Sequence, residues 1–138
     1  MKFSIKVQYG IQALLELAVK YGGGLNQIGD IAQSQKIPVR YLEQILLILK
    51  KKGLVSSSRG KEGGYSLLKH PADVSVLEII ECLDGPIELS NKKMKKVPVV
   101  FEAFEKIQNN IINDLRELTL EDMALKKRQK ERAYIYNI

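Results

Sequence analysis

The hydrophobic positions in the first fifty residues recur at helical spacing in three separate segments. In the first segment, over residues 4–21, the apolar positions that follow this spacing are Ile11, Leu14, Leu15, Ala18 and Tyr21. Ser4 is a residue type that caps helix starts, and three consecutive glycines at 22–24 cannot continue a helix. We therefore predict a first helix from about Ser4 to Tyr21.

The next two segments predict a short helix, a tight connection and a longer helix. The short helix is expected over residues 27–35 with Asn26 as its cap, followed by a turn at residues 36–37. Pro38 stands where proline is favoured, in the first turn of a helix that runs to Lys52, and Gly53 ends it. The positions of this third helix that should face inward are Leu42, Ile45, Leu46 and Leu49.

After Gly53 the pattern changes from helical to extended. Residues 54–58 and 65–68 predict two short strands, and the glycine-rich segment 59–64 predicts the hairpin tip between them. Helix, short helix, turn, helix and hairpin is the element order of a winged helix-turn-helix unit. The fold class expected is therefore mainly α with a small β-hairpin wing.

The second half of the chain predicts a fourth helix from Ser75, where Ser75 and Glu78 have capping-box spacing, and then a polar connection over 84–96. A long helix over 98–118 carries an apolar stripe, which spans about 32 Å at ~1.5 Å per residue. The stripe needs a cover, either a second copy of the helix or the chain's own domain; we expect a homodimer. The dimerisation residues expected are Phe101, Phe104, Ile107, Ile111, Leu115 and Leu118.

These elements divide the chain into two parts. Residues 1–83 form the expected winged helix-turn-helix DNA-binding domain. Residues 84–138 form the connection, the long dimerisation helix, a last short helix marked by Thr119 and Asp122, and a C-terminal tail from Ala133.

Composition and charge narrow the functional class. The apolar fraction of 45% supports a folded core, and apolar runs stay well below the ~20 residues that cross a membrane. With a single cysteine and without a signal-peptide pattern, the chain is expected in the cytoplasm, away from membranes. Residues 1–65 hold ten basic and four acidic residues, whereas residues 66–138 hold twelve of each. A cationic half indicates a nucleic-acid partner, although a solvated basic surface has the same charge.

The start of the third helix carries polar side chains that suit base recognition. Arg40 and Gln44 can each make two hydrogen bonds, to guanine and adenine respectively, and Glu43 can accept from cytosine. Tyr41 can donate to a phosphate or pack beneath the backbone. Taken alone, this helix end would be read as an exposed surface.

The hairpin tip adds a second basic feature. Arg59 and Lys61 flank Gly60, and such a basic wing can enter the minor groove or hold phosphates. An ordinary hairpin loop is the alternative, but the preceding helix-turn-helix favours a wing.

The residue types in the sequence give little reason to expect catalysis or metal binding. The single histidine, His70, and the single cysteine, Cys82, are far apart in sequence and offer neither a catalytic triad nor a metal-ligand set. We therefore predict that the protein is not an enzyme and holds no metal. His70 is read as a surface residue and Cys82 as a core residue, with a redox role as its alternative.

Several of these segments resemble the Rrf2 family of bacterial winged-helix regulators. The resemblance rests on residues 4–10, 41–45, 53–57, 59–60 and 63–67, and it continues through 119–122. It implies that the third helix enters the major groove, the wing enters the minor groove and the long helix forms the dimer. The residues expected at the DNA are Ser4, Lys6, Pro38, Val39, Arg40, Tyr41, Glu43, Gln44, Arg59, Gly60 and Lys61.

The chain departs from many members of that family in one respect. Those members carry three cysteines in the connection before the long helix, which hold an iron–sulfur cluster, whereas the connection here contains none. We therefore expect no cluster and no other cofactor. Residues 84–87 and 133–138 resemble a cluster-free branch of the family that represses cysteine metabolism genes together with cysteine synthase.

The function expected is thus a homodimeric, sequence-specific transcriptional repressor of cysteine or sulfur metabolism genes. The alternative is a winged-helix protein–protein adaptor with only non-specific DNA binding. Cysteine synthase is a possible co-repressor, and Tyr136, Asn137 and Ile138 are the expected docking residues, because a terminal isoleucine carboxylate can be captured by backbone donors. A tail strand packed on its own dimer is the competing interpretation.

Overall fold

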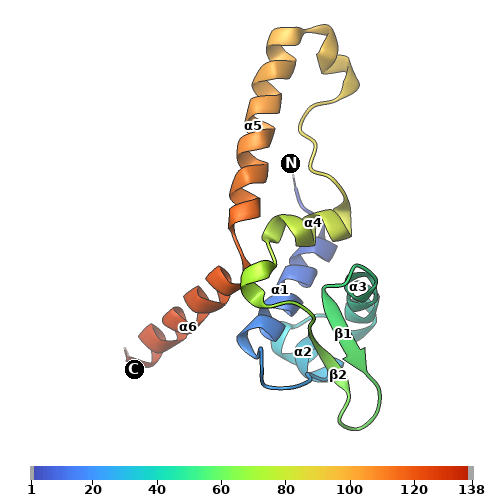
Figure 1. Ribbon diagram of the computed structural model, residues 1–138, viewed down its shortest axis with the longest axis vertical. Coiled ribbons are helices and arrows are strands. Elements are labelled where there is room, and N and C mark those ends of the chain that lie inside the picture. Colours follow the sequence, from blue (N-terminus) through green and yellow to red (C-terminus); the bar gives the residue numbers. More distant parts are fainter. Residues whose placement is uncertain (1, 137–138) are drawn as a thin grey trace.

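The computed structural model describes residues 2–136, which form a winged-helix domain with two projecting helices (Figure 1). The core is built from the apolar faces of the first four helices, the hairpin and the start of the last helix. Its largest fully buried side chains include Leu14, Leu17, Leu42, Leu46, Leu49 and Ile79. Within residues 2–136, no helix is both long and apolar enough to span a bilayer.

The first three helices are α1 (Ile5–Val19), α2 (Ile28–Gln35) and α3 (Val39–Lys51). The expected inward face of α3 is confirmed, because all four of its predicted core residues are buried. The expected cap of α2 is wrong by one residue, because Gln27 rather than Asn26 is its N-cap. Pro38, expected in the first turn of α3, is instead its N-cap. Pro38 stays extended there, since its ψ is 131°.

The hairpin consists of β1 (Val55–Ser58) and β2 (Gly64–Leu67), paired antiparallel with Val55 opposite Leu67. Asn26 joins β2 as an isolated bridge: its amide donates to Tyr65 O at 2.9 Å and its carbonyl accepts from Tyr65 N at 2.8 Å. Gly64 makes this approach possible, because a Cβ there would lie 2.5 Å from Asn26 O. The wing is therefore anchored to the segment that precedes α2.

A short helix, η1 (Pro71–Asp73), and α4 (Val76–Asp84) complete the domain. Ser75 Oγ accepts from Glu78 N at 3.1 Å, so half of the expected capping box forms. The Glu78 carboxylate instead accepts from Lys69 Nζ at 2.9 Å. The Glu78 side chain therefore ties α4 to the end of the hairpin.

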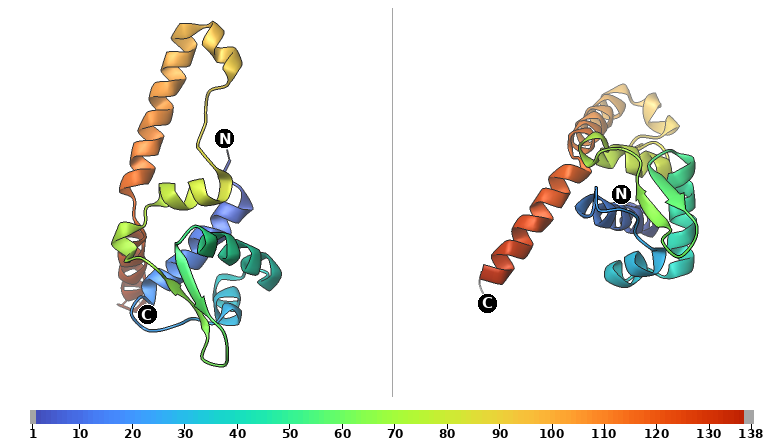
Figure 2. Two further views of the ribbon diagram at one scale, coloured as in Figure 1. Left: turned by 45° about the vertical axis from the view of Figure 1, so that its right-hand side comes forward. Right: turned by 60° about the horizontal axis from the view of Figure 1, so that its bottom comes forward.

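After α4 the chain forms an arm. A connection leads to the short helix η2 (Lys92–Lys96), and α5 (Pro98–Glu117) returns to the domain. Figure 1 and the left view of Figure 2 show α5 standing away from the domain and meeting it at its base, where it contacts α4. Every residue of α5 is at least partly exposed, so the helix does not fold back over its own core.

The last helix, α6 (Leu120–Tyr136), corrects the prediction of a short helix followed by a tail. The capping pair at its start is reciprocal, with Thr119 N bonded to Asp122 Oδ2 at 3.0 Å and Asp122 N to Thr119 Oγ1 at 3.1 Å. Residues 133–136 are helical, so the alternative of a tail strand is also wrong for them; Asn137 and Ile138 lie outside the described residues.

The first half of α6 is docked on α1. Leu120 and Ala124 are fully buried, and the Arg128 guanidinium donates to Val19 O at 2.9 Å. The second half of the helix projects from the domain (Figure 1).

Glu16 is a buried acid between α1, α2 and α6. Its carboxylate pairs with Lys20 at 2.9 Å and lies 3.9 Å from Lys127 Nζ, and it accepts from Gln35 Nε2 at 2.8 Å. Burial raises the pKa of Glu16, but hydrogen bonds, that from Lys20 first, outweigh it and lower the pKa below 4.5. The acid is thus held ionised and joins three helices.

Candidate nucleic-acid interface

The first turns of α3 present polar side chains to solvent. Arg40, Glu43 and Gln44 are exposed, whereas Leu42 and Ile45, their neighbours in sequence, are buried in the core. Helical spacing therefore puts the three polar residues on the outer face of α3 and anchors the helix by the opposite face. This arrangement leaves the outer face free to enter a groove.

Tyr41 and Val39 differ from these neighbours. The Tyr41 ring is half-buried and packs edge-on against Tyr9 of α1, with ring centroids 5.5 Å apart and an interplanar angle of 82°. Tyr41 therefore helps to position α3 on α1. Val39 and Pro38 are exposed at the start of α3, where they can contact a neighbouring molecule.

The start of α1 is fixed by Ser4. Its hydroxyl donates to Asp84 Oδ1 at 2.7 Å and accepts from Val7 N at 3.2 Å, while its amide donates to Asp84 Oδ2 at 3.2 Å. Both hydrogen-bonding roles of the hydroxyl are thus used inside the domain, so Ser4 positions the start of α1 against α4. Lys6 lies two residues further along and is half-buried.

The tip of the wing carries Arg59, Gly60 and Lys61, all exposed. Gly60 has φ 108°, a conformation that glycine adopts without strain. Gln27 Nε2 donates to Lys61 O at 2.7 Å, so the backbone of the tip is held while the Lys61 side chain stays exposed.

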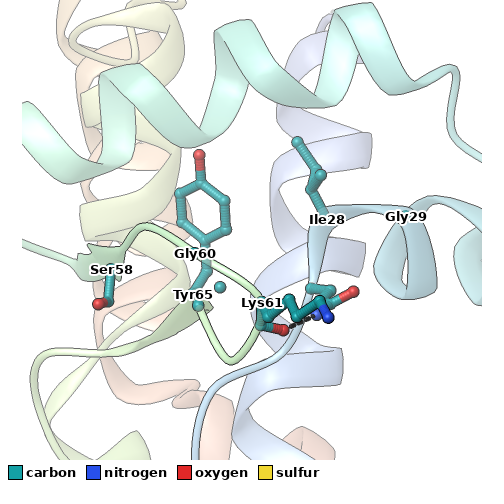
Figure 3. A pocket seen from close by; sticks show the side chains of 9 residues that line it. Ile28, Gly29, Ser58, Gly60, Lys61 and Tyr65 are labelled. Atoms are coloured by element: carbon teal, nitrogen blue, oxygen red, sulfur yellow. Dashed lines mark hydrogen bonds between the residues drawn. The ribbon is translucent and has the colours of Figure 1, made fainter.

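The wing and the start of α2 enclose an open groove of about 510 Å³. Figure 3 shows Tyr65 rising from the hairpin on one side and Ile28 on the other, with the dashed hydrogen bond at Lys61 closing one end. Asn26 and Gln27, which hold the wing to α2, are functional positions that the sequence reasoning did not identify. Their polar side chains before α2 signalled only a helix cap.

The predicted DNA residues belong to the start of α1, the start of α3 and the tip of the hairpin. Figure 1 shows α3 and the hairpin together, with α5 and α6 pointing elsewhere. Arg40, Arg59 and Lys61 form no ion pair within residues 2–136. A surface with free cations on both a protruding helix end and an adjacent hairpin suits the phosphate backbone and a groove of a duplex.

The predicted dimerisation residues form an apolar stripe on α5. Phe104, Ile107 and Leu118 are exposed, and Phe101, Ile111 and Leu115 are partly buried. At the base of the helix Leu115 packs against the core of its own domain, so the uncovered part of the stripe lies further along α5. An uncovered apolar stripe of this kind is typical of an interface with another chain.

The single histidine and the single cysteine, His70 and Cys82, are not among the predicted DNA-binding residues. His70 is exposed and its Nδ1 accepts from Ala72 N at 3.0 Å, so it caps η1. Cys82 is partly buried rather than in the core; burial raises the pKa of its thiol, and nearby Glu78 raises it further. A thiol with a raised pKa is a weak nucleophile at neutral pH.

Metal-ligand residues do not gather in the described part of the chain. Within residues 2–136, no group of three or more His, Cys, Asp and Glu side chains could hold an ion. The connection from residue 85 to 97 contains neither cysteine nor histidine. An iron–sulfur cluster needs several thiolates, so the residues present do not fit one.

Comparisons with known proteins agree with this geometry. Residues 3–126 match the family model Rrf2, described as an iron-dependent transcriptional regulator. The chain is 36% identical to the HTH-type transcriptional regulator CymR of Bacillus subtilis, over the full length of both. The structure of CymR, titled the global cysteine regulator of B. subtilis, has a TM-score of 0.76 and 33% identity over 91% of this chain and 98% of that one.

A second solved structure, IscR of T. potens, has a TM-score of 0.78 and 36% identity over 99% of this chain and 96% of that one. The family is described as iron-dependent, but residues 2–136 of this chain contain no group of three or more His, Cys, Asp and Glu side chains that could hold an iron ion. The winged-helix fold class and the resemblance stated from the sequence are both confirmed.

Proposed function

Because the chain belongs to the Rrf2 family of transcriptional regulators, we propose that it represses transcription by binding operator DNA as a homodimer. The observation that carries this proposal is the exposed polar face of Arg40, Glu43 and Gln44 on α3, a helix that packs against β1 of the basic wing. In this proposal α3 reads base edges in the major groove, and Arg59 enters the adjacent minor groove.

The dimer in this proposal forms through the α5 stripe. A two-fold axis repeats the α3 and wing surface, so an operator carries two half-sites about one helical turn apart, ~34 Å, or a multiple of it. Recruitment of RNA polymerase would be hindered by such a dimer on a promoter, which is the physical basis of repression.

The proposed targets are cysteine or sulfur metabolism genes. Support comes from the full-length similarity to CymR, whose structure is titled as that of a global cysteine regulator. The test is selection of genomic fragments by the purified protein, followed by gel shifts with the half-site spacing altered. We expect fragments upstream of sulfur genes, and loss of binding after insertion of half a helical turn. Equal binding to every fragment would contradict sequence-specific repression and favour the alternative, a protein–protein adaptor with only non-specific DNA binding.

We further propose cysteine synthase as a co-repressor that binds the C-terminal end. Supporting this, Tyr136 is 90% exposed at the end of a projecting helix, so a partner can reach this end of α6. In the proposal the partner binds Tyr136, Asn137 and Ile138. Deleting Asn137 and Ile138 should abolish co-purification with cysteine synthase while DNA binding persists; unchanged co-purification would contradict docking through this end.

A further inference from the structure

The far end of the arm carries a cluster of positive charge that the proposed interface does not use. We call it the lysine tip; it consists of Lys92, Lys93, Lys95 and Lys96 on η2. All four lysines are exposed, and no acidic residue lies between Glu88 and Glu102. Within residues 2–136 none of the four lysines forms an ion pair.

The lysine tip is held in place rather than left as a loose loop. Asn91 Oδ1 accepts from Met94 N at 3.2 Å, which caps η2, and Val97 N donates to Met94 O at 2.9 Å. Leu89 N donates to Gln108 Oε1 at 2.8 Å and ties the connection to α5. The positive charges are therefore concentrated at one point of the arm, about 30 Å from its base if α5 rises ~1.5 Å per residue.

The relative direction of the two arms in a dimer determines where each lysine tip lies. A parallel pair would bring two lysine tips together, and eight like charges would repel. An antiparallel pair separates them and carries each tip level with the base of the other arm. There the second copy presents α4, which contacts α5, and the start of α1, which Ser4 and Asp84 tie to the end of α4.

That position in the second copy carries charges of both signs. Lys2 lines a pocket there with Asp84 and Glu88, and Lys6 lies four residues further along the chain. The four lysines of the tip have no ion-pair partner within residues 2–136, so a polyanion would neutralise them. The DNA backbone is the polyanion that the proposed function supplies.

We propose that the lysine tip is an additional phosphate-binding surface, which contacts the DNA backbone beside the second protomer's winged-helix domain. This inference rests on the proposed function and extends it to the arm. Contacts of this kind add affinity without sequence information, because phosphates are the same in every sequence. The arm would thus lengthen the footprint of each protomer and make dimerisation and DNA binding support each other.

The test is the salt dependence of DNA binding by the full chain. The tip variant is Lys92→Gln/Lys93→Gln/Lys96→Gln, which leaves Lys95 in place because its Nζ lies 5.8 Å from the Phe101 ring centroid. The matched control removes three exposed cations from α6, on the opposite side of α1 from α3 (Figure 2): Lys126→Gln/Lys130→Gln/Arg132→Gln. A tip variant with arginine at the same three positions keeps the charge.

Each lysine that neutralises a phosphate adds ~0.9 to the slope of log K against log salt. Three lysines on each of two protomers therefore account for a slope of up to ~5, and we expect the glutamine tip variant to lose about 2–5. The loss should be equal on operator and random duplexes, and the arginine tip variant and the α6 control should stay within about one of the wild-type slope.

Three results would overturn the inference. If the wild-type protein binds its operator and the glutamine tip variant keeps the full slope, the tip is not on the DNA, although the proposed function stands. If the slope is kept but the variant dimer dissociates more readily in sedimentation without DNA, the lysines instead contact the second copy. If the wild-type protein binds no duplex, the proposed function fails and the inference fails with it.

Discussion

Truncating the apolar stripe on α5 should separate the protomers. Phe104 is 39% exposed and Ile107 is 49% exposed in the single chain. Complete burial of such a side chain is worth about 1.5–3 kcal/mol, so covering the remaining surface gives roughly 1 kcal/mol for each. Two side chains on each of two protomers give about 4 kcal/mol, which corresponds to about a thousandfold change in the dimer Kd. We therefore expect Phe104→Ala/Ile107→Ala to weaken the dimer by about that factor.

The assay is sedimentation equilibrium over a concentration series, with thermal unfolding to show that the domain remains folded. The control is Val99→Ala: Val99 is 78% exposed, and helical spacing puts it with Ala103 and Lys106, off the stripe. It should leave the dimer Kd within about threefold. A double variant that dimerises as tightly as the wild-type protein would show that the stripe is not the interface and would refute the predicted change in the dimer Kd.

Three further predictions concern the domain itself. Gly64→Ala should destabilise the wing by about 1–3 kcal/mol in thermal unfolding, because its φ is 144° and the new Cβ would meet Asn26 O; an unchanged Tm would contradict the anchoring role of Asn26. Glu16 has a lowered pKa, so its contribution to the free energy of unfolding is present above pH 4.5 and is lost as the pH falls through the folded-state pKa. Glu16→Gln should therefore flatten the stability profile in that acid range, and an identical acid profile would refute this. Cys82, with its raised pKa, should react with a thiol reagent at neutral pH more slowly than a free cysteine does, and equal rates would contradict its burial.

Local pattern was enough to predict the winged-helix unit. Leu42, Ile45 and Leu46 repeat at helical spacing, and Gly53 ends the helix with φ 79°, so both the face and the end of α3 follow from neighbouring residues. The hairpin was predicted to within one residue at each strand because glycines cluster between two extended runs.

Other features depend on contacts that sequence spacing does not reveal. Asn26 was assigned as a cap because polar residues before a helix usually act so, but its backbone pairs with Tyr65, 39 residues away. The length of α6 was missed because residues 126–132 are all polar, so no apolar stripe marked the middle of the helix. The absence of glycine and proline after Pro98 was the available signal that the helix continues.

The site was only partly predictable for the same reason. The exposure of Arg40 and Gln44 follows from the spacing of buried residues on α3, whereas the use of Ser4 to bind Asp84 requires that α1 and α4 meet in space. The packing of the Tyr41 ring on Tyr9 was not predicted, because it likewise depends on how α1 and α3 meet in space.

Sequence reading by α3 is tested most directly by measuring the Kd of the Arg40→Ala and Gln44→Ala variants for DNA. Each variant is measured on the selected operator and on a scrambled duplex at one salt concentration. If α3 reads base edges, each variant should lose about 1–3 kcal/mol on the operator, roughly 5- to 150-fold in Kd, and much less on the scrambled duplex. Equal losses on both duplexes, or no loss on either, would contradict sequence reading by this helix.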